Sequence, residues 1–135
     1  MSYKNLDQQN LSFLKELLST NSPSGYEVNA AKVWQNYVNQ FAEVSGDVLN
    51  NSIGVLNPQA EFKIMIAGHY DEIGLQVMYI SKEGYLYVRR LGGIDLLSLP
   101  GSEVVVITKK GTISGVLGKI PIHVQSPTER TKAIE

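Results

Sequence analysis

The stretch FKIMIAGHYDEIG at residues 62–74 places a short apolar run directly before a His-x-Asp pair. The run Phe62–Ala67 is too short for a helix and predicts a buried strand. Alternate side chains of an extended chain point the same way, so His69 and Asp71 are expected to share a face at the end of that strand. A neutral imidazole binds divalent metals well, and a carboxylate two residues on can orient the ring. We take this stretch as the candidate functional site, although the same spacing is common among surface residues at strand ends.

The sequence before this stretch predicts two helices. Leucines recur at helical spacing over Leu6–Ser19, and a second apolar stripe that includes Trp34 follows over Gly25–Phe41. Ser24, with Glu27 three residues later, fits a capping box in which each side chain satisfies a free backbone N–H. Helices followed by strands indicate an α/β layer with the helices packed on a sheet.

Short strands joined by turns are predicted on both sides of the His-x-Asp pair. Before it, Val48-Leu49, the turn-prone Asn50-Asn51 and Ile53–Leu56 favour a hairpin. After it, helical periodicity disappears and glycine-containing turns separate four strand-like segments, which is typical of a small barrel or sandwich. These segments are Leu75–Ile80, Tyr85–Arg90, Glu103–Thr108 and Thr112–Leu117. We therefore predict an α/β part at residues 1–74 and a β-rich part at residues 75–135.

The composition excludes several classes of protein. With 135 residues, 43% apolar and 19% charged, the chain has the make-up of a soluble globular protein. A net charge of −1 does not favour nucleic-acid binding. The absence of cysteine excludes disulfides and thiolate zinc sites, so a transition metal would need His and carboxylate ligands. No signal peptide or membrane-length apolar run is present, so we expect a cytoplasmic protein without a membrane partner.

Several motifs, in order and at similar spacing, resemble the N-terminal portion of metallopeptidase family forty-two. This family comprises glutamyl and deblocking aminopeptidases, and some members are named endoglucanases. The matching pieces are Leu17-Leu18, Ser22–Glu27 (SPSGYE), Ala67–Gly74 (AGHYDEIG), Gly92–Asp95 (GGID), Gly111–Gly118 (GTISGVLG) and Pro121–His123 (PIH). The resemblance implies part of an α/β aminopeptidase-type catalytic domain followed by part of an inserted, β-barrel-like dimerisation domain. It also implies a homo-oligomer that acts on peptides.

In that family two divalent ions, commonly zinc or cobalt, share a bridging water, an arrangement that polarises a carbonyl and generates hydroxide. By position, His69 resembles a ligand of one ion, and Asp71 resembles the catalytic-site carboxylate that orients His69. His123 falls in the β-rich part, where we expect a structural role. The family's other metal ligands and its general base lie downstream of the inserted domain, beyond Glu135.

A single imidazole with one carboxylate does not supply the three or four ligands of a catalytic zinc site. We therefore expect the 135-residue chain alone to bind at most one ion weakly and to be inactive as a peptidase. The alternative is a non-catalytic β-rich module for self-association or protein binding, and reading the coding region past codon 135 would separate the two. A carbohydrate hydrolase would need two opposed carboxylic acids, and no such pair stands out.

Overall fold

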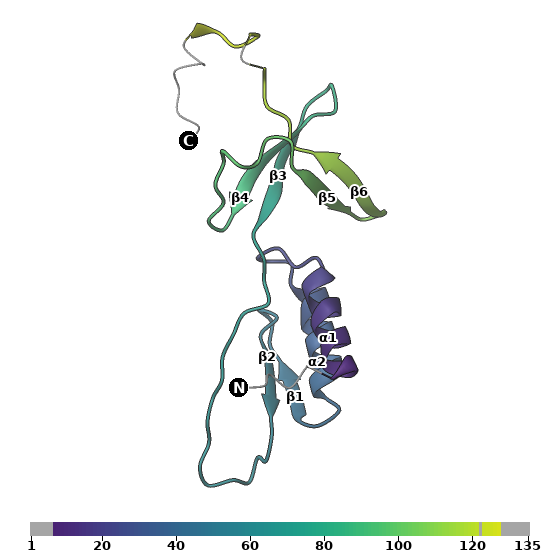
Figure 1. Cartoon of the computed structure of the whole chain (residues 1–135), viewed down its shortest axis with the longest axis vertical. Helices are drawn as coiled ribbons and strands as arrows, with labels where there is room; N and C mark the ends of the chain where they lie inside the picture. Colours follow the sequence, from purple (N-terminus) through teal and green to yellow (C-terminus); the bar gives the residue numbers. More distant parts are fainter. Residues whose placement is uncertain (1–6, 122, 128–135) are drawn as a thin grey trace. The chain divides into compact units, whose positions relative to one another are not determined.

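The computed structural model describes residues 7–121 and 123–127, which contain two helices and three β-hairpins. In chain order the elements are α1 (Gln8–Ser19), α2 (Val28–Val38), β1 (Glu43–Gly46), β2 (Ser52–Val55), β3 (Gly74–Ile80), β4 (Leu86–Leu91), β5 (Glu103–Thr108) and β6 (Gly111–Val116) (Figure 1). The chain divides after Gly93 into two compact units. The first holds both helices and β1–β4, and the second holds β5 and β6. The predicted boundary between residues 74 and 75 stays a prediction.

Helix α1 begins at a side-chain cap and contacts α2 through aromatic rings. Asp7 accepts a hydrogen bond from the Asn10 backbone N–H at 2.8 Å, which satisfies a free donor of the first turn. The rings of Phe13 and Tyr37 stack with centroids 3.9 Å apart. The predicted helix started at Leu6, which lies outside the described residues. On the predicted leucine stripe, Leu18 is 75% exposed, so part of that stripe is not covered within the described chain.

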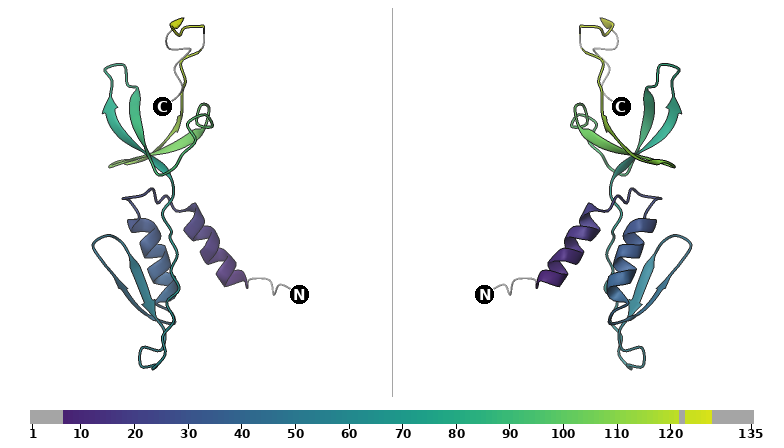
Figure 2. Two further views of the ribbon diagram at one scale, coloured as in Figure 1. Left: turned by 90° about the vertical axis from the view of Figure 1, so that its left-hand side faces the viewer. Right: turned by 90° about the vertical axis from the view of Figure 1, so that its right-hand side faces the viewer.

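Helix α2 packs against the β1–β2 hairpin, which runs alongside it in both views of Figure 2. Ala30, Ala31 and Val38 are buried on this helix. Gly54 of β2 allows the close approach, because a Cβ there would lie 2.7 Å from Val38 Cγ1 and 3.1 Å from Trp34 Cη2. Trp34 is half-buried at this contact, as expected for a packing residue. The expected layer of helices on a sheet is therefore reduced to one helix on a two-stranded sheet.

The β1–β2 hairpin starts earlier than the sequence predicts. Its register runs from Glu43 opposite Val55 to Gly46 opposite Ser52, which places Val48-Leu49 in the loop. The reason is Asp47, whose carboxylate accepts hydrogen bonds from the backbone N–H groups of Leu49 and Asn51, each at 2.9 Å. These bonds give the backbone an alternative to strand pairing. The prediction of a Val48-Leu49 strand is therefore wrong.

The apolar run Phe62–Ala67 does not form a strand, which corrects a second prediction. It belongs to the long open connection between β2 and β3 in Figure 1. Phe62 is 80% exposed and Ile66 is 94% exposed. A strand with apolar residues on both faces needs neighbours on both sides and cover on both faces. The described part of the chain supplies neither.

Strands β3 and β4 pair antiparallel with an irregularity between Val77 and Tyr79, and β5 pairs antiparallel with β6. The segments predicted as Leu75–Ile80 and Glu103–Thr108 are thus strands, and Tyr85–Arg90 and Thr112–Leu117 are each displaced by one residue. Within residues 7–121 and 123–127 each sheet has two strands, so a closed barrel is not formed there. In the same residues no helix is long and apolar enough to cross a membrane.

We predict that Asp47→Ala destabilises the β1–β2 hairpin in a pH-dependent way. Hydrogen bonds from Asn51 lower the pKa of Asp47 below its ordinary 3.8. The carboxylate's stabilising contribution is therefore present above the ordinary value and is lost as the pH falls through the lowered, folded-state pKa. Urea unfolding followed against pH should show a difference between wild type and variant that closes in acid. Glu61→Ala, which removes an exposed carboxylate from the neighbouring loop, is the control. A difference that persists unchanged in acid would contradict the role of Asp47.

Candidate metal site

Two segments far apart in the sequence, Ser22–Ser24 and Tyr70–Glu72, pair side by side, and we call them the serine–acid bridge. Pro23 and Glu72 form a parallel β-bridge. The Glu72 N–H donates to the Ser22 carbonyl at 2.9 Å, and the Ser24 N–H donates to the Glu72 carbonyl at 3.2 Å. The Ser22 hydroxyl donates to the Tyr70 carbonyl at 2.8 Å, and Ser22 is only 3% exposed. The bridge thus fixes the backbone on either side of Asp71.

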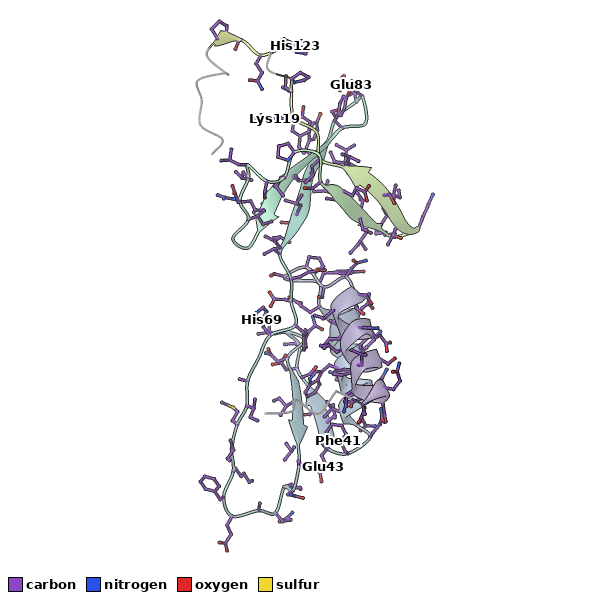
Figure 3. All side chains as sticks on the ribbon, viewed as in Figure 1. Phe41, Glu43, His69, Glu83, Lys119 and His123 are labelled. Carbon is purple, nitrogen blue, oxygen red and sulfur yellow. The ribbon has the colours of Figure 1, made fainter. Side chains whose placement is uncertain are left out.

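The two site residues predicted from the sequence are in contact. His69 Nδ1 lies 3.0 Å from Asp71 Oδ1. The His69 side chain is 86% exposed and that of Asp71 is 38% exposed. In the view of Figure 3, the His69 ring lies on the side of the extended segment opposite the helices. In the neutral ring, an Nδ1–H that donates to the carboxylate leaves the Nε2 lone pair free toward solvent.

A third residue, Ser24, completes this group and was missed in the sequence. Its hydroxyl donates to Asp71 Oδ2 at 2.6 Å. This hydrogen bond is the largest cause of the lowered pKa of Asp71; burial raises that pKa, and His69 lowers it further. Asp71 is therefore ionised at neutral pH and can accept hydrogen bonds from both neighbours.

The capping-box interpretation of Ser24 and Glu27 is wrong. Glu27 occupies the N-cap position of α2, but its side chain makes no cap hydrogen bond with the helix and accepts instead from the Gly25 N–H. Ser24 is turned away from the helix by a tight turn in which the Tyr26 N–H donates to the Pro23 carbonyl at 2.8 Å. Gly25 provides the φ of +89° that this turn requires.

Tyr70 ties the bridge to the β1–β2 hairpin. Its hydroxyl donates to the Asn50 carbonyl and lies 3.2 Å from the Ser52 hydroxyl. Glu72, which we did not expect to be a ligand, accepts from the Ser22 N–H at 2.8 Å. Both side chains thus hold the backbone in place.

The described residues offer one nitrogen ligand with an orienting acid. No group of three or more His, Cys, Asp or Glu side chains that could hold a metal is found among them. His123, expected to be structural, is exposed in a turn of the second unit, where the Val124 N–H donates to the Pro121 carbonyl at 2.9 Å. His69, with Asp71 beside it, is suited to supply one ligand of a metal site, and further ligands are needed to complete that site.

We predict that Gly74→Ala loosens the serine–acid bridge. A Cβ at Gly74 would lie 2.6 Å from Pro23 Cβ, so one of the two segments must move. Over-packing of this kind typically costs about 1–3 kcal/mol. Denaturant unfolding should show this loss, and the amide hydrogens of Ser24 and Glu72 should exchange faster. Gly68→Ala is the matched control, because a Cβ at Gly68 meets no atom within 4 Å. Equal behaviour of the two variants would contradict the contact.

Comparison with known proteins identifies related sequences and a family. The sequence model of the M42 glutamyl aminopeptidase family matches residues 50–135. A lysyl aminopeptidase from Pyrococcus furiosus is 34% identical over 114 residues, which cover 83% of this chain and 33% of the relative.

Solved structures agree with the sequence match. A TET aminopeptidase from the marine sediment archaeon Thaumarchaeota archaeon SCGC AB-539-E09 superposes with a TM-score of 0.84 at 36% identity, covering 93% of this chain and 35% of that one. The TET1 peptidase of Pyrococcus horikoshii, which assembles into a tetrahedron or a large octahedral shell, gives a TM-score of 0.75 at 35% identity, covering 93% of this chain and 37% of that one. The chain spans about a third of the length of the relatives it matches. It belongs to the M42 glutamyl aminopeptidase family.

Proposed function

We propose that this chain contributes His69 and Asp71 to the metal centre of an aminopeptidase that removes N-terminal residues from peptides. The observation that carries the proposal is the 3.0 Å contact between His69 Nδ1 and an Asp71 carboxylate that Ser24 also holds. Metal-binding histidines almost always donate their second ring nitrogen to such a partner. The family match supplies the reaction class.

Each residue has a defined task in this proposal. Asp71, kept ionised by its hydrogen bonds, accepts the Nδ1–H of His69 and fixes both the ring orientation and the tautomer. His69 then presents Nε2 as the ligand atom. A divalent ion held there supplies a Lewis acid for the scissile carbonyl and lowers the pKa of a bound water. The donor set suits zinc or cobalt, since imidazole and carboxylate ligands bind both.

The other ligands of a two-ion centre and the general base are proposed to come from outside residues 1–135. In isolation the chain then binds at most one ion weakly and does not hydrolyse peptides. This proposal is supported by the number of ligands required. A catalytic zinc needs about three protein ligands, and among the described residues no group of three or more potential ligands surrounds the His69 ring nitrogen.

We further propose that residues 75–135 contribute to a homo-oligomer. Tyr79 and Tyr87, cross-strand neighbours on β3 and β4, have ring centroids 5.6 Å apart, and each is 57% exposed. Paired, exposed aromatic rings of this kind are typical of surfaces that become buried in assemblies. A purely non-catalytic module for self-association would use the same surface. Metal binding therefore distinguishes that module from a portion of an aminopeptidase.

We predict that His69→Ala abolishes the binding of zinc or cobalt to the chain. Among the described residues the His69 ring is the imidazole that contacts an orienting acid, so its removal leaves dispersed carboxylates and the separate imidazole of His123. Isothermal titration calorimetry of the metal-free chain should give a weak one-site isotherm for wild type and none for the variant. His123→Ala is the matched control and should bind as wild type does. Undiminished binding by His69→Ala would favour the non-catalytic module.

We predict that, in the longest protein that the gene encodes, Asp71→Asn lowers the hydrolysis of an aminoacyl anilide about 10–100-fold. An amide presents an N–H where the carboxylate accepts one, so the His69 ring loses its fixed orientation. Initial rates at saturating metal give kcat/KM for both proteins. Wild-type rates in Asp71→Asn would contradict the role of Asp71, and activity of the 135-residue chain alone would contradict its dependence on further ligands.

A further inference from the structure

We propose that Ser24 is a positioning residue for His69 and acts through Asp71. The inference rests on the proposed function, because it concerns how the ligand atom of that site is aimed. Ser24 and His69 hold the two oxygens of one carboxylate: the Ser24 hydroxyl lies 2.6 Å from Oδ2, and His69 Nδ1 lies 3.0 Å from Oδ1.

The need for a second holding group follows from the freedom of an aspartate side chain. The χ2 torsion of Asp is broad, so a carboxylate held at one oxygen can rotate about its Cβ–Cγ bond. A hydrogen bond to the opposite oxygen fixes the carboxylate plane. The contact of His69 Nδ1 with Oδ1 depends on that plane, since the His69 side chain is 86% exposed and has little packing to orient it. Nδ1 also lies 3.2 Å from the Asp71 backbone carbonyl, a longer contact that does not involve the carboxylate.

Ser24 is itself held by contacts that do not involve His69. Its backbone N–H donates to the Glu72 carbonyl at 3.2 Å, and the Pro23–Tyr26 turn places its hydroxyl beside Asp71. Ser24 and Asp71 are 47 residues apart in the sequence. The orientation of the His69 ring therefore depends on Ser24, in the segment that precedes α2, and not on residues 69–71 alone.

The Ser24 hydroxyl is expected to affect which tautomer the His69 ring adopts. A carboxylate held with Oδ1 facing Nδ1 favours the neutral tautomer that carries its hydrogen on Nδ1. That tautomer leaves the Nε2 lone pair available to a cation, whereas the other tautomer blocks Nε2 with a hydrogen. Loss of the Ser24 hydroxyl should therefore shift the tautomer population before any metal is added.

The experiment measures the His69 tautomer by ¹⁵N NMR in the metal-free chain under mildly alkaline conditions. Ser24→Ala should lower the ratio of the Nδ1–H to the Nε2–H tautomer about two- to tenfold, the effect of one net hydrogen bond. Ser24→Thr keeps the hydroxyl and should restore the ratio. The amide of Ser24, bonded to Glu72 in the native fold, reports whether each variant is folded.

Ser22→Ala is the matched control, since the Ser22 hydroxyl bonds the Tyr70 carbonyl in the same bridge and does not touch Asp71. It should leave the tautomer ratio unchanged. An equal shift in Ser22→Ala, or no shift in Ser24→Ala, would overturn the assignment of the effect to Ser24. In an Asp71→Ala background the Ser24→Ala change should have no effect on the ring, and a surviving effect would show that Ser24 does not act through Asp71.

Zinc titration of the same proteins separates this inference from the proposed function. Ser24→Ala should weaken zinc binding by about the factor found for the tautomer ratio, with Ser24→Thr close to wild type. If wild type binds no zinc, the proposed function fails although the tautomer result stands. If His69→Ala abolishes zinc binding while Ser24→Ala changes neither readout, the proposed function stands and the positioning role fails.

Discussion

The parallel pairing of Ser22–Ser24 with Tyr70–Glu72 is the constraint on which the candidate site depends. Two backbone hydrogen bonds and three hydrogen bonds that involve side chains join the segments, and Gly74 lets Pro23 approach without a clash. This pairing places the Ser24 hydroxyl beside Asp71, which in turn contacts His69. The site therefore consists of one local pair, His69 and Asp71, held in place by one non-local segment.

The sequence predicted those parts of the fold that are decided by neighbouring residues. Glu103–Thr108 is a strand as expected, because a run of β-branched residues followed by a glycine turn suffices for a hairpin. The prediction from sequence was wrong where a side chain offered the backbone a different hydrogen-bond partner, as Asp47 does for the N–H of Leu49. It failed also at Phe62–Ala67, because a strand with apolar residues on both faces forms only beside neighbours that the described chain does not provide.

The same distinction explains what could be predicted of the site. The contact between His69 and Asp71 follows from a two-residue spacing in extended chain. Ser24 could not be found in this way, because Ser-x-x-Glu before an apolar run also predicts a helix cap, and only the tertiary pairing turns its hydroxyl toward Asp71. The motif SPSGYE did indicate the family, so its importance was visible although its structural role was not. Assembly is likewise beyond local signals, since exposed tyrosines identify a surface and not its occupant.

We propose that His69, oriented by Asp71, presents Nε2 to a divalent ion. A crystal of the chain soaked in zinc and measured at the zinc absorption edge tests this most directly. We expect an anomalous peak about 2.0–2.1 Å from His69 Nε2, with Nδ1 still bonded to Asp71. A zinc peak bound to Nδ1, with the carboxylate turned away, or zinc found only at other residues would contradict it.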